Sequence, residues 1–288
     1  MNILKHFLKI IVELGKVRIA LPVALSALAG FVLYKGEINS QALLMALGVF
    51  LMACASGTLN HWQERKTDAK MPRTQLRPLP SGRITSLQGF MVALGYAAAG
   101  SFILLFSNPL TALVLSWATL ASYNLIYTPL KKVTAFAVIP GSLVGALPPL
   151  IGWTAAGGQI FSETILIVAT FFFIGQIPHF WLLLMLFGDQ YKLAGLPSLT
   201  DIFSEVQLKR VTYAWVLTTI ASAFLVLFFV FTSRILLFIL LAYVLFLMIS
   251  LSRSVIFREN FKVLQAFYQL NFLYLFMMLF LIAEGLLR

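Results

Sequence analysis

Long apolar stretches alternate with short polar ones along the whole of this chain. Nine segments are apolar enough, and near enough to 20 residues in length, to cross a bilayer as helices. They are residues 18–35, 41–60, 87–107, 109–127, 134–155, 161–186, 211–231, 235–252 and 266–286. The pattern predicts an all-α, polytopic membrane protein with about nine transmembrane helices in a single domain over residues 1–288.

The positions of lysine and arginine support this span count. If the N-terminus is cytoplasmic, the cytoplasmic segments carry 18 basic residues, and the opposite side keeps only Lys35, Arg234 and Arg288. Such an excess is typical of cytoplasmic loops. The net charge of +11 therefore reflects topology, and nothing indicates nucleic-acid binding. We expect a multi-pass protein of the cytoplasmic (inner) membrane, with the N-terminus and the two long polar loops in the cytoplasm.

Composition excludes a soluble domain, because 60% of the residues are hydrophobic and 11% are charged. Residues 1–17 combine Lys5, Lys9 and Lys16 with leucine and isoleucine, which suits a short interfacial helix. Cys54 is the only cysteine, so an internal disulfide and a cysteine metal cluster are excluded. We interpret it as a packing residue.

The densest polar run, residues 60–83, starts at the end of the second apolar segment. Asn60, Glu64 and Asp68 are spaced at i, i+4 and i+8, so a helix would place them on one face. Two carboxylates and an amide supply the oxygen ligands that a hard cation such as Mg²⁺ prefers. The alternative interpretation is a solvated loop that only anchors orientation.

Other charged residues extend this candidate site. Arg73 and Arg77 follow with the same spacing, and guanidinium groups suit phosphate oxygens. The second long polar loop, residues 187–210, faces the same side and carries Asp189 among its acids. Two such loops could hold a diphosphate through Mg²⁺ while its lipid tail lies among the helices. Four further acids are interpreted as ordinary loop or end charges: Glu37, Glu163, Glu259 and Glu284.

Four segments carry a more specific pattern. They are Asp68–Arg83, Tyr127–Lys132, Gly145–Trp153, and Gln176–Phe180 followed by Asp189–Tyr191. In this order they resemble motifs of the UbiA superfamily of intramembrane prenyltransferases, and most closely its haem O synthase (protohaem IX farnesyltransferase) family. The resemblance is specific over residues 56–200 and general elsewhere.

The resemblance implies helices around a central chamber, with Mg²⁺ as cofactor. It also implies transfer of a farnesyl group from farnesyl diphosphate to a vinyl group of haem B, which gives haem O. A downstream haem-modifying oxidase is a candidate partner. The implied metal ligands are Asn60, Glu64, Asp68 and Asp189, and the implied diphosphate clamp is Arg73, Arg77, Lys131 and Lys132. Tyr127 is a candidate catalytic residue at the allylic cation or leaving group.

Two histidines are candidate haem-iron ligands. His179 follows Pro178 inside the sixth apolar segment, where a proline disturbs the helix and local irregularity is tolerated only against protein or a cavity. The alternative is an interior histidine, hydrogen-bonded in the gap that the proline leaves. His61, beside Asn60, is the weaker candidate.

The chain also departs from the family's pattern. Gln190 stands where an acid usually precedes the tyrosine, and glutamine is a poor substitute for carboxylate at Mg²⁺. Alternatives therefore stay open: an aromatic or quinone-precursor acceptor, or a catalytically silent haem-binding paralogue. A transporter would carry its intramembrane charges near mid-bilayer and in repeated halves. Here the acids cluster at one membrane face and no internal repeat is evident, which counts against it.

Overall fold

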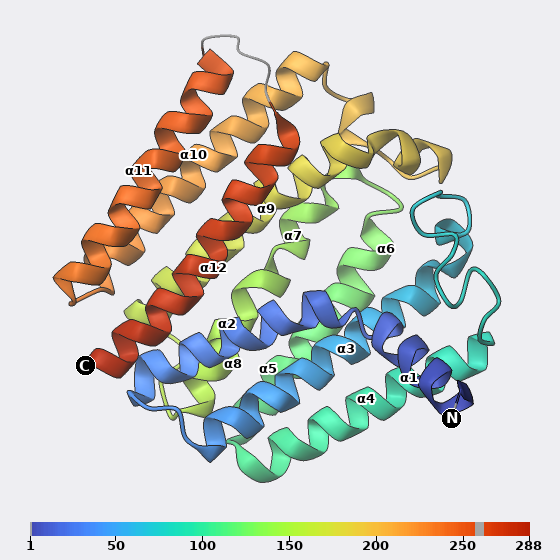
Figure 1. The fold of residues 1–288 in the computed structure, drawn as a ribbon, viewed down its shortest axis with the longest axis horizontal. Coiled ribbons are helices and arrows are strands. Elements are labelled where there is room, and N and C mark those ends of the chain that lie inside the picture. The colour runs from blue at the N-terminus through green and yellow to red at the C-terminus, as the bar shows by residue number, and fades with distance from the viewer. Residues whose placement is uncertain (1, 257–261) are drawn as a thin grey trace.

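The apolar segments form the long helices of the bundle in Figure 1, a computed structural model that describes residues 2–256 and 262–288. Nine candidate membrane-spanning helices lie in these described ranges, as the sequence predicts, and the same ranges contain no strand. Part of the predicted loop 253–265, with Glu259, lies outside them. The long helices are α2 (Val17–Lys35), α3 (Ser40–Asp68), α4 (Ser86–Ser107), α5 (Leu110–Ala121), α8 (Leu143–Ala155), α9 (Glu163–Leu193), α10 (Glu205–Phe229), α11 (Arg234–Ile256) and α12 (Val263–Leu287).

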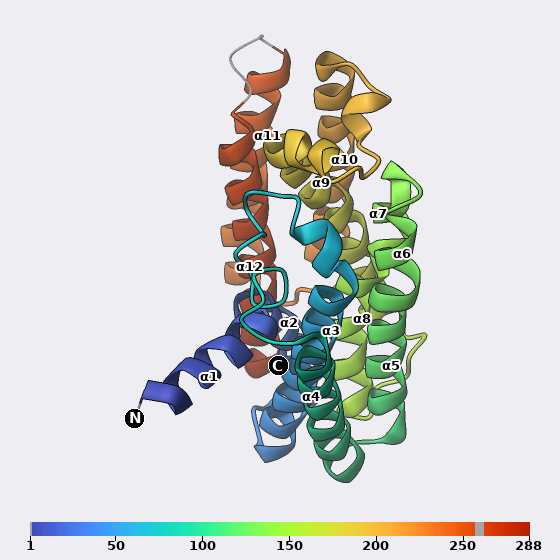
Figure 2. The ribbon, with the colours of Figure 1, turned by 90° about the vertical axis from the view of Figure 1, so that its right-hand side faces the viewer.

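Short elements connect these helices. A π-helical turn continues α5, and two short segments lead into α8, so each of these two spans is assembled from several pieces. The remaining elements are α1 (Asn2–Leu14), which precedes α2, and the connecting segments η1 (Ser122–Tyr127), α6 (Thr128–Leu130), η2 (Ala135–Ala137), α7 (Val138–Gly141) and η3 (Leu199–Asp201). Figure 2 shows α1 standing off to one side of the bundle, as expected of an interfacial helix.

Helix ends follow local chemistry. Thr85 and Gln88 form a capping box at the start of α4, and Ser204 and Gln207 form one at the start of α10. Each box satisfies backbone N–H groups that the first turn of a helix leaves unpaired. The side chain of Asn39 caps α3 in a similar way, by accepting from the N–H of Ala42.

Glycines allow helices α2 and α8 to touch at their backbones. A side chain at Gly152 would collide with the carbonyl of Ala27, and one at Gly30 would collide with the carbonyl of Pro149. Small residues at such crossings are characteristic of membrane helices, where close packing drives association. Cys54 is fully buried in α3, in keeping with its predicted packing role.

The two polar loops are shorter than predicted, because helices extend into them. Helix α3 continues to Asp68, α9 continues to Leu193 with a kink at Phe187, and α10 begins at Glu205. Figure 1 shows the turns after α3 (cyan) beside the segment after α9 (yellow) at one end of the bundle. The acids of both motifs therefore sit on or next to helix ends.

The interpretation of Glu284 as an ordinary end charge is wrong. Its side chain is completely buried near the end of α12 and accepts a 2.8 Å hydrogen bond from the N–H of Thr232 and a 3.2 Å bond from that of Ser233. Arg288 adds an ion pair at 3.3 Å. Glu284 thus fixes the connection between α10 and α11 by satisfying its backbone donors.

Candidate functional site

The last turns of α3 place three polar side chains on one buried face. Asn60, Glu64 and Asp68 are 1%, 6% and 1% exposed. The helix ends at Asp68, shortly before Pro72, which disfavours helical backbone in the residue before it. A row of amide and carboxylate oxygens therefore runs along the end of a membrane helix.

Each of these three side chains contacts a basic residue from a different part of the chain. Lys16 Nζ donates to Asn60 Oδ1 at 2.7 Å. Lys131 forms an ion pair with Glu64. Arg77 Nη1 lies 2.8 Å from Asp68 Oδ2. The fold thus brings three positive charges, from three separate segments, onto one face of α3.

The environment of the two lysines differs. Burial, helped by the nearby Arg77, lowers the pKa of Lys16 to about 7 despite the opposing effect of Glu64. Burial is also the largest single effect on Lys131 and acts in the same direction, but the Glu64 carboxylate and the nearby side chains of Tyr127, Tyr123 and Tyr191 together outweigh it and raise the pKa of Lys131 above its usual range. An anion bound beside Lys16 would favour its charged form.

The π-helical turn η1 is tied to α3 by side-chain hydrogen bonds. Asn124 accepts from Ser56 Oγ at 2.7 Å and donates to Gln63 Oε1 at 3.1 Å. One helical turn later, Thr128 Oγ1 accepts from Asn60 Nδ2 at 3.1 Å. These bonds hold the segment that carries Tyr127 and Lys131 against the polar face.

Tyr127 lies in an aromatic group next to this face. Its ring centroid is 5.4 Å from that of Tyr123 and 5.7 Å from that of Phe180, and Lys131 Nζ is 5.7 Å from the Tyr127 ring. Gly141 makes room for the ring, since a side chain there would overlap Tyr127. Aromatic faces of this kind stabilise cations.

Three residues predicted for the metal and diphosphate site, Arg73, Lys132 and Asp189, have no hydrogen bond or ion pair with the face of α3 in the described parts of the chain. Arg73 is exposed; its guanidinium lies 4.6 Å from the Phe187 ring centroid, and its N–H donates to Gln190 Oε1 at 3.2 Å. Lys132 and Asp189 are exposed to solvent. Gln190 stands where the family pattern has an acid. Its side-chain oxygen accepts from the backbone N–H of Arg73 and so connects the two polar loops.

The residues present fit Mg²⁺ when a diphosphate completes the site. In the described parts of the chain no three His, Cys, Asp or Glu side chains gather closely enough to hold a metal ion by themselves. Mg²⁺ is commonly bound by one or two carboxylates together with substrate phosphates and water. Glu64 and Asp68 supply such carboxylates, and Asn60 supplies an amide oxygen on the same face.

Both candidate haem ligands, His179 and His61, have buried ring nitrogens without a hydrogen-bond partner in the described parts of the chain. His179, in the middle of α9, packs its ring 5.0 Å from that of Phe267 and 5.6 Å from that of Phe180. Its Nδ1 is buried and finds no hydrogen-bond partner in the described parts of the chain, and the same is true of both ring nitrogens of His61. A side-chain hydrogen bond with Asn271 nevertheless ties the His179 ring to α12, so the alternative of a hydrogen-bonded interior histidine also stays open.

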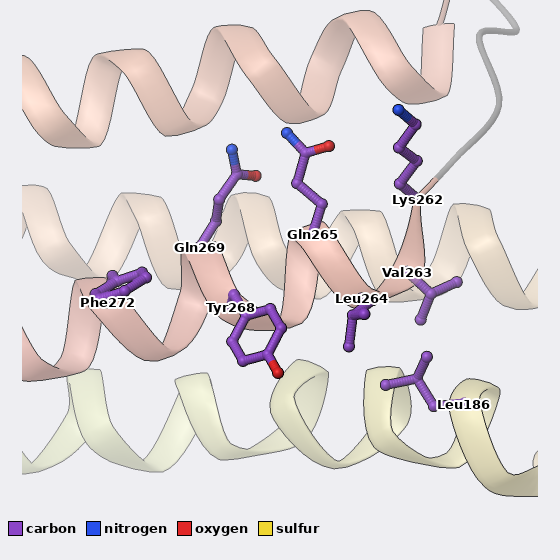
Figure 3. Close-up of a pocket in the computed structure, with 8 residues that line it drawn as sticks. All are labelled: Leu186, Lys262, Val263, Leu264, Gln265, Tyr268, Gln269 and Phe272. Atoms are coloured by element: carbon purple, nitrogen blue, oxygen red, sulfur yellow. The ribbon is translucent and has the colours of Figure 1, made fainter.

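A separate pocket of about 720 Å³ lies near the start of α12. Figure 3 shows Gln265, Gln269 and Lys262 on one side of that helix, while Tyr268 and Leu264 point towards Leu186 of α9. No residue of the predicted site lines this pocket.

Sequence reasoning missed three side chains that organise the site. Lys16, grouped with the interfacial lysines, instead contacts Asn60; Asn124 and Thr128 connect η1 and α6 to α3. The asparagine and threonine carried no spacing signal, because their partners lie 61 and 68 residues away. Only the fold brings them together.

Comparison with known proteins gives consistent results. The UbiA prenyltransferase family matches residues 23–280. A protoheme IX farnesyltransferase from Oleidesulfovibrio alaskensis is 39% identical over 185 residues. That alignment covers 64% of this chain and 66% of the relative, so the chain matches slightly less than two thirds of the relative's length.

Solved structures share the fold at low sequence identity. A UbiA homologue from Aeropyrum pernix K1 superposes with a TM-score of 0.73 at 16% identity, covering 94% of this chain and 98% of the other. A UbiA homologue from Archaeoglobus fulgidus, bound to GPP and Mg²⁺, gives a TM-score of 0.71 at 15% identity, with coverage of 97% and 100%. These similarities establish the helical architecture.

Proposed function

The chain belongs to the UbiA prenyltransferase family, and from this premise we propose that it transfers a farnesyl group from farnesyl diphosphate to a vinyl group of haem B, giving haem O. The observation that carries the proposal is the face of α3, where Glu64 and Asp68 lie buried beside Lys131 and Arg77. Buried carboxylates and cations at the end of a membrane helix mark a functional site. A diphosphate attached to a lipid tail has the chemistry that such a site recognises.

The difficult step is rupture of the allylic carbon–oxygen bond, which leaves a carbocation and a diphosphate anion. Mg²⁺, when bound, neutralises charge on the diphosphate oxygens. Arg77 and Lys131 are aimed along the same face and stabilise the departing anion electrostatically. Arg73 and Lys132, the other two residues of the predicted clamp, are exposed, and we assign them a minor part in it.

Aromatic rings and apolar walls protect the cation. Tyr127, Tyr123 and Phe180 present π faces beside the cationic end of the site. The vinyl carbon of haem B then attacks the allylic carbon, and water adds to the resulting cation to form the hydroxyethyl group. Exclusion of water until that attack prevents simple hydrolysis of the farnesyl diphosphate.

Haem B as acceptor is supported by the name of the Oleidesulfovibrio relative and by the surroundings of His179. His179 Nδ1 is buried among aromatic rings and finds no hydrogen-bond partner in the part of the chain that the structure describes, so it is available as an axial iron ligand. His61 is the second candidate ligand. We place the protein in the cytoplasmic membrane with its polar loops in the cytoplasm, where a downstream haem-modifying oxidase would receive the product. An aromatic or quinone-precursor acceptor is the rival within the family.

The test is mass spectrometry of haem after incubating purified protein with haem B, farnesyl diphosphate and Mg²⁺. We expect a haem whose mass has increased by a farnesyl group and one hydroxyl group, because the water that adds to the cation releases a proton, and no such product from Glu64→Ala or Asp68→Ala. Asp201→Ala, in an exposed acid of the second loop, is the matched control. Farnesyl diphosphate consumption with unchanged haem B, together with prenylation of an aromatic acceptor, would reject the haem O assignment.

A further inference from the structure

The junction between α1 and α2 has an unusual backbone. Lys16 adopts φ 49° and ψ 46°, and it is the only non-glycine residue with positive φ in the described parts of the chain. The left-handed conformation is unfavourable for a lysine, and residues held in it cluster at binding and active sites.

Close packing holds this turn against α3. A side chain added at Gly57 would lie 3.3 Å from the carbonyl oxygen of Gly15 and 3.4 Å from Lys16 Cβ. One added at Gly15 would lie 3.1 Å from the hydroxyl of Tyr96 and 3.2 Å from Cys54. The Tyr96 hydroxyl also donates to the carbonyl of Ile11 at 3.3 Å. Glycines on both sides thus allow the junction to approach α3 closely enough for Lys16 to enter the site.

Within the site, Lys16 occupies the end nearest the bilayer. From the start of α3 to Asn60 is about 30 Å, the thickness of the hydrocarbon region, so Asn60 lies where the helix leaves it. Glu64 and Asp68 follow about 6 and 12 Å further along the axis. Lys16, bonded to Asn60 at 2.7 Å, is therefore the deepest of the three cations on this face.

We propose that Lys16 binds the phosphate that carries the allylic oxygen, and so acts on the leaving group of the prenyl diphosphate. This inference rests on the proposed function, because it takes a prenyl diphosphate as the ligand of the α3 face. The prenyl tail lies in the apolar region, so the phosphate attached to it lies at the deep end. When the carbon–oxygen bond breaks, its electron pair stays on that oxygen, and the Lys16 ammonium stabilises the new negative charge.

A purely structural role makes a different prediction. If Lys16 only orients the Asn60 amide, loss of its charge would alter the melting temperature without a selective effect on the diphosphate. If it binds the leaving group, its charge is required both for affinity and for turnover. Lys16→Gln removes the charge and keeps a polar side chain of similar reach, whereas Lys16→Arg keeps the charge.

The experiment measures binding of farnesyl thiodiphosphate, an unreactive analogue, with Mg²⁺ and without an acceptor, by calorimetry in detergent. Turnover of farnesyl diphosphate is measured alongside. We expect Lys16→Gln to weaken binding about 10- to 100-fold, since hydrogen bonds to charged groups have that effect, and to lower kcat further. Lys16→Arg should recover most of the affinity. Arg18→Gln is the matched control, because Arg18 is two residues away and exposed.

The outcomes separate the two proposals. Wild-type affinity and kcat in a folded Lys16→Gln variant, while Glu64→Gln loses binding, would overturn the role of Lys16 and leave the proposed function standing. Equal losses in Lys16→Gln and Lys16→Arg, with lowered melting temperatures in both, would also overturn it, because shape rather than charge would then matter. Absence of analogue binding in the wild-type protein would reject the proposed function itself, and the inference with it.

Discussion

The two polar regions at the same end of the bundle are built very differently. At the end of α3 the Asp68 side chain is 2% exposed and that of Glu64 is 7% exposed, and each is paired with a basic residue from outside α3. In the second polar region, the last turn of α9 and the segment after it, the charged side chains are exposed: those of the ion pair between Lys192 and Asp201 are 47% and 50% exposed. Acidic and basic side chains thus form buried ion pairs in the first region and exposed ion pairs in the second.

The contrast indicates where the chemistry is concentrated. Solvent-exposed ion pairs contribute little to stability and are screened by salt. Buried charges carry a desolvation penalty, so their retention calls for a functional reason. Glu64 and Asp68 meet this criterion, whereas Asp189 and Asp201 do not. The first motif therefore carries the proposed site, and the second contributes the Gln190 side chain, which accepts a hydrogen bond from the backbone N–H of Arg73.

The largest effect is expected at the acids of α3. Glu64→Gln and Asp68→Asn should each lower kcat/KM for farnesyl diphosphate by about 100- to 1000-fold, because both remove charge that would help to hold the Mg²⁺ diphosphate. Initial rates of diphosphate release at several Mg²⁺ concentrations provide the measurement. Near-normal rates at saturating Mg²⁺ would show that these acids are dispensable.

The second largest effect on activity is expected at Lys131, in contrast to its neighbour Lys132. Lys131→Met should lower kcat/KM about 100-fold and destabilise the protein by about 3 kcal/mol, because the Glu64 carboxylate loses its buried partner. Lys132→Met, at an exposed position, should change either quantity only slightly. The double variant Glu64→Gln with Lys131→Met should recover stability but not activity. Thermal unfolding in detergent and the same rate assay measure both quantities; equal behaviour of the two lysines would contradict the assigned geometry.

A smaller effect separates the two arginines. Arg77→Lys should lower kcat/KM about 10-fold, since lysine cannot reproduce the directed guanidinium contact with Asp68 and diphosphate. Arg73→Lys should cost no more than about 3-fold, because Arg73 stacks on Phe187 away from the face of α3. Steady-state kinetics on the pair of variants tests this order. The reverse order would place Arg73, rather than Arg77, on the diphosphate.

The smallest effect is expected at Asp189. Asp189→Asn should reduce kcat/KM by less than about 3-fold, since the side chain is exposed and exposed charges act weakly on a buried site. Titration of Mg²⁺ in the presence of farnesyl thiodiphosphate gives an independent readout, in which the midpoint should stay unchanged. A loss as large as that in Asp68→Asn would mean that the second loop closes over the substrate and supplies a ligand.

The length and hydrophobicity of the apolar segments predicted much of this architecture. All nine spans follow from these two properties, because a bilayer demands about 20 apolar residues per crossing and helices satisfy every backbone group internally. The spacing of Asn60, Glu64 and Asp68 also predicted a shared face, since that relation depends only on helical geometry within one element. Glu284 was misread because its partners, Thr232 and Ser233, lie about 50 residues away.

The sequence by itself determined the class of protein, its spans and the row of oxygen ligands on α3, all of which are local properties of a chain in a membrane. Only the tertiary structure decided which basic side chains contact Asn60, Glu64 and Asp68. Lys16, Lys131 and Arg77 reach it through a left-handed turn, a π-helical turn and an irregular loop, respectively. These contacts depend on packing between segments that are far apart in the sequence, as at Gly15 and Gly57. No spacing along the chain therefore predicts them.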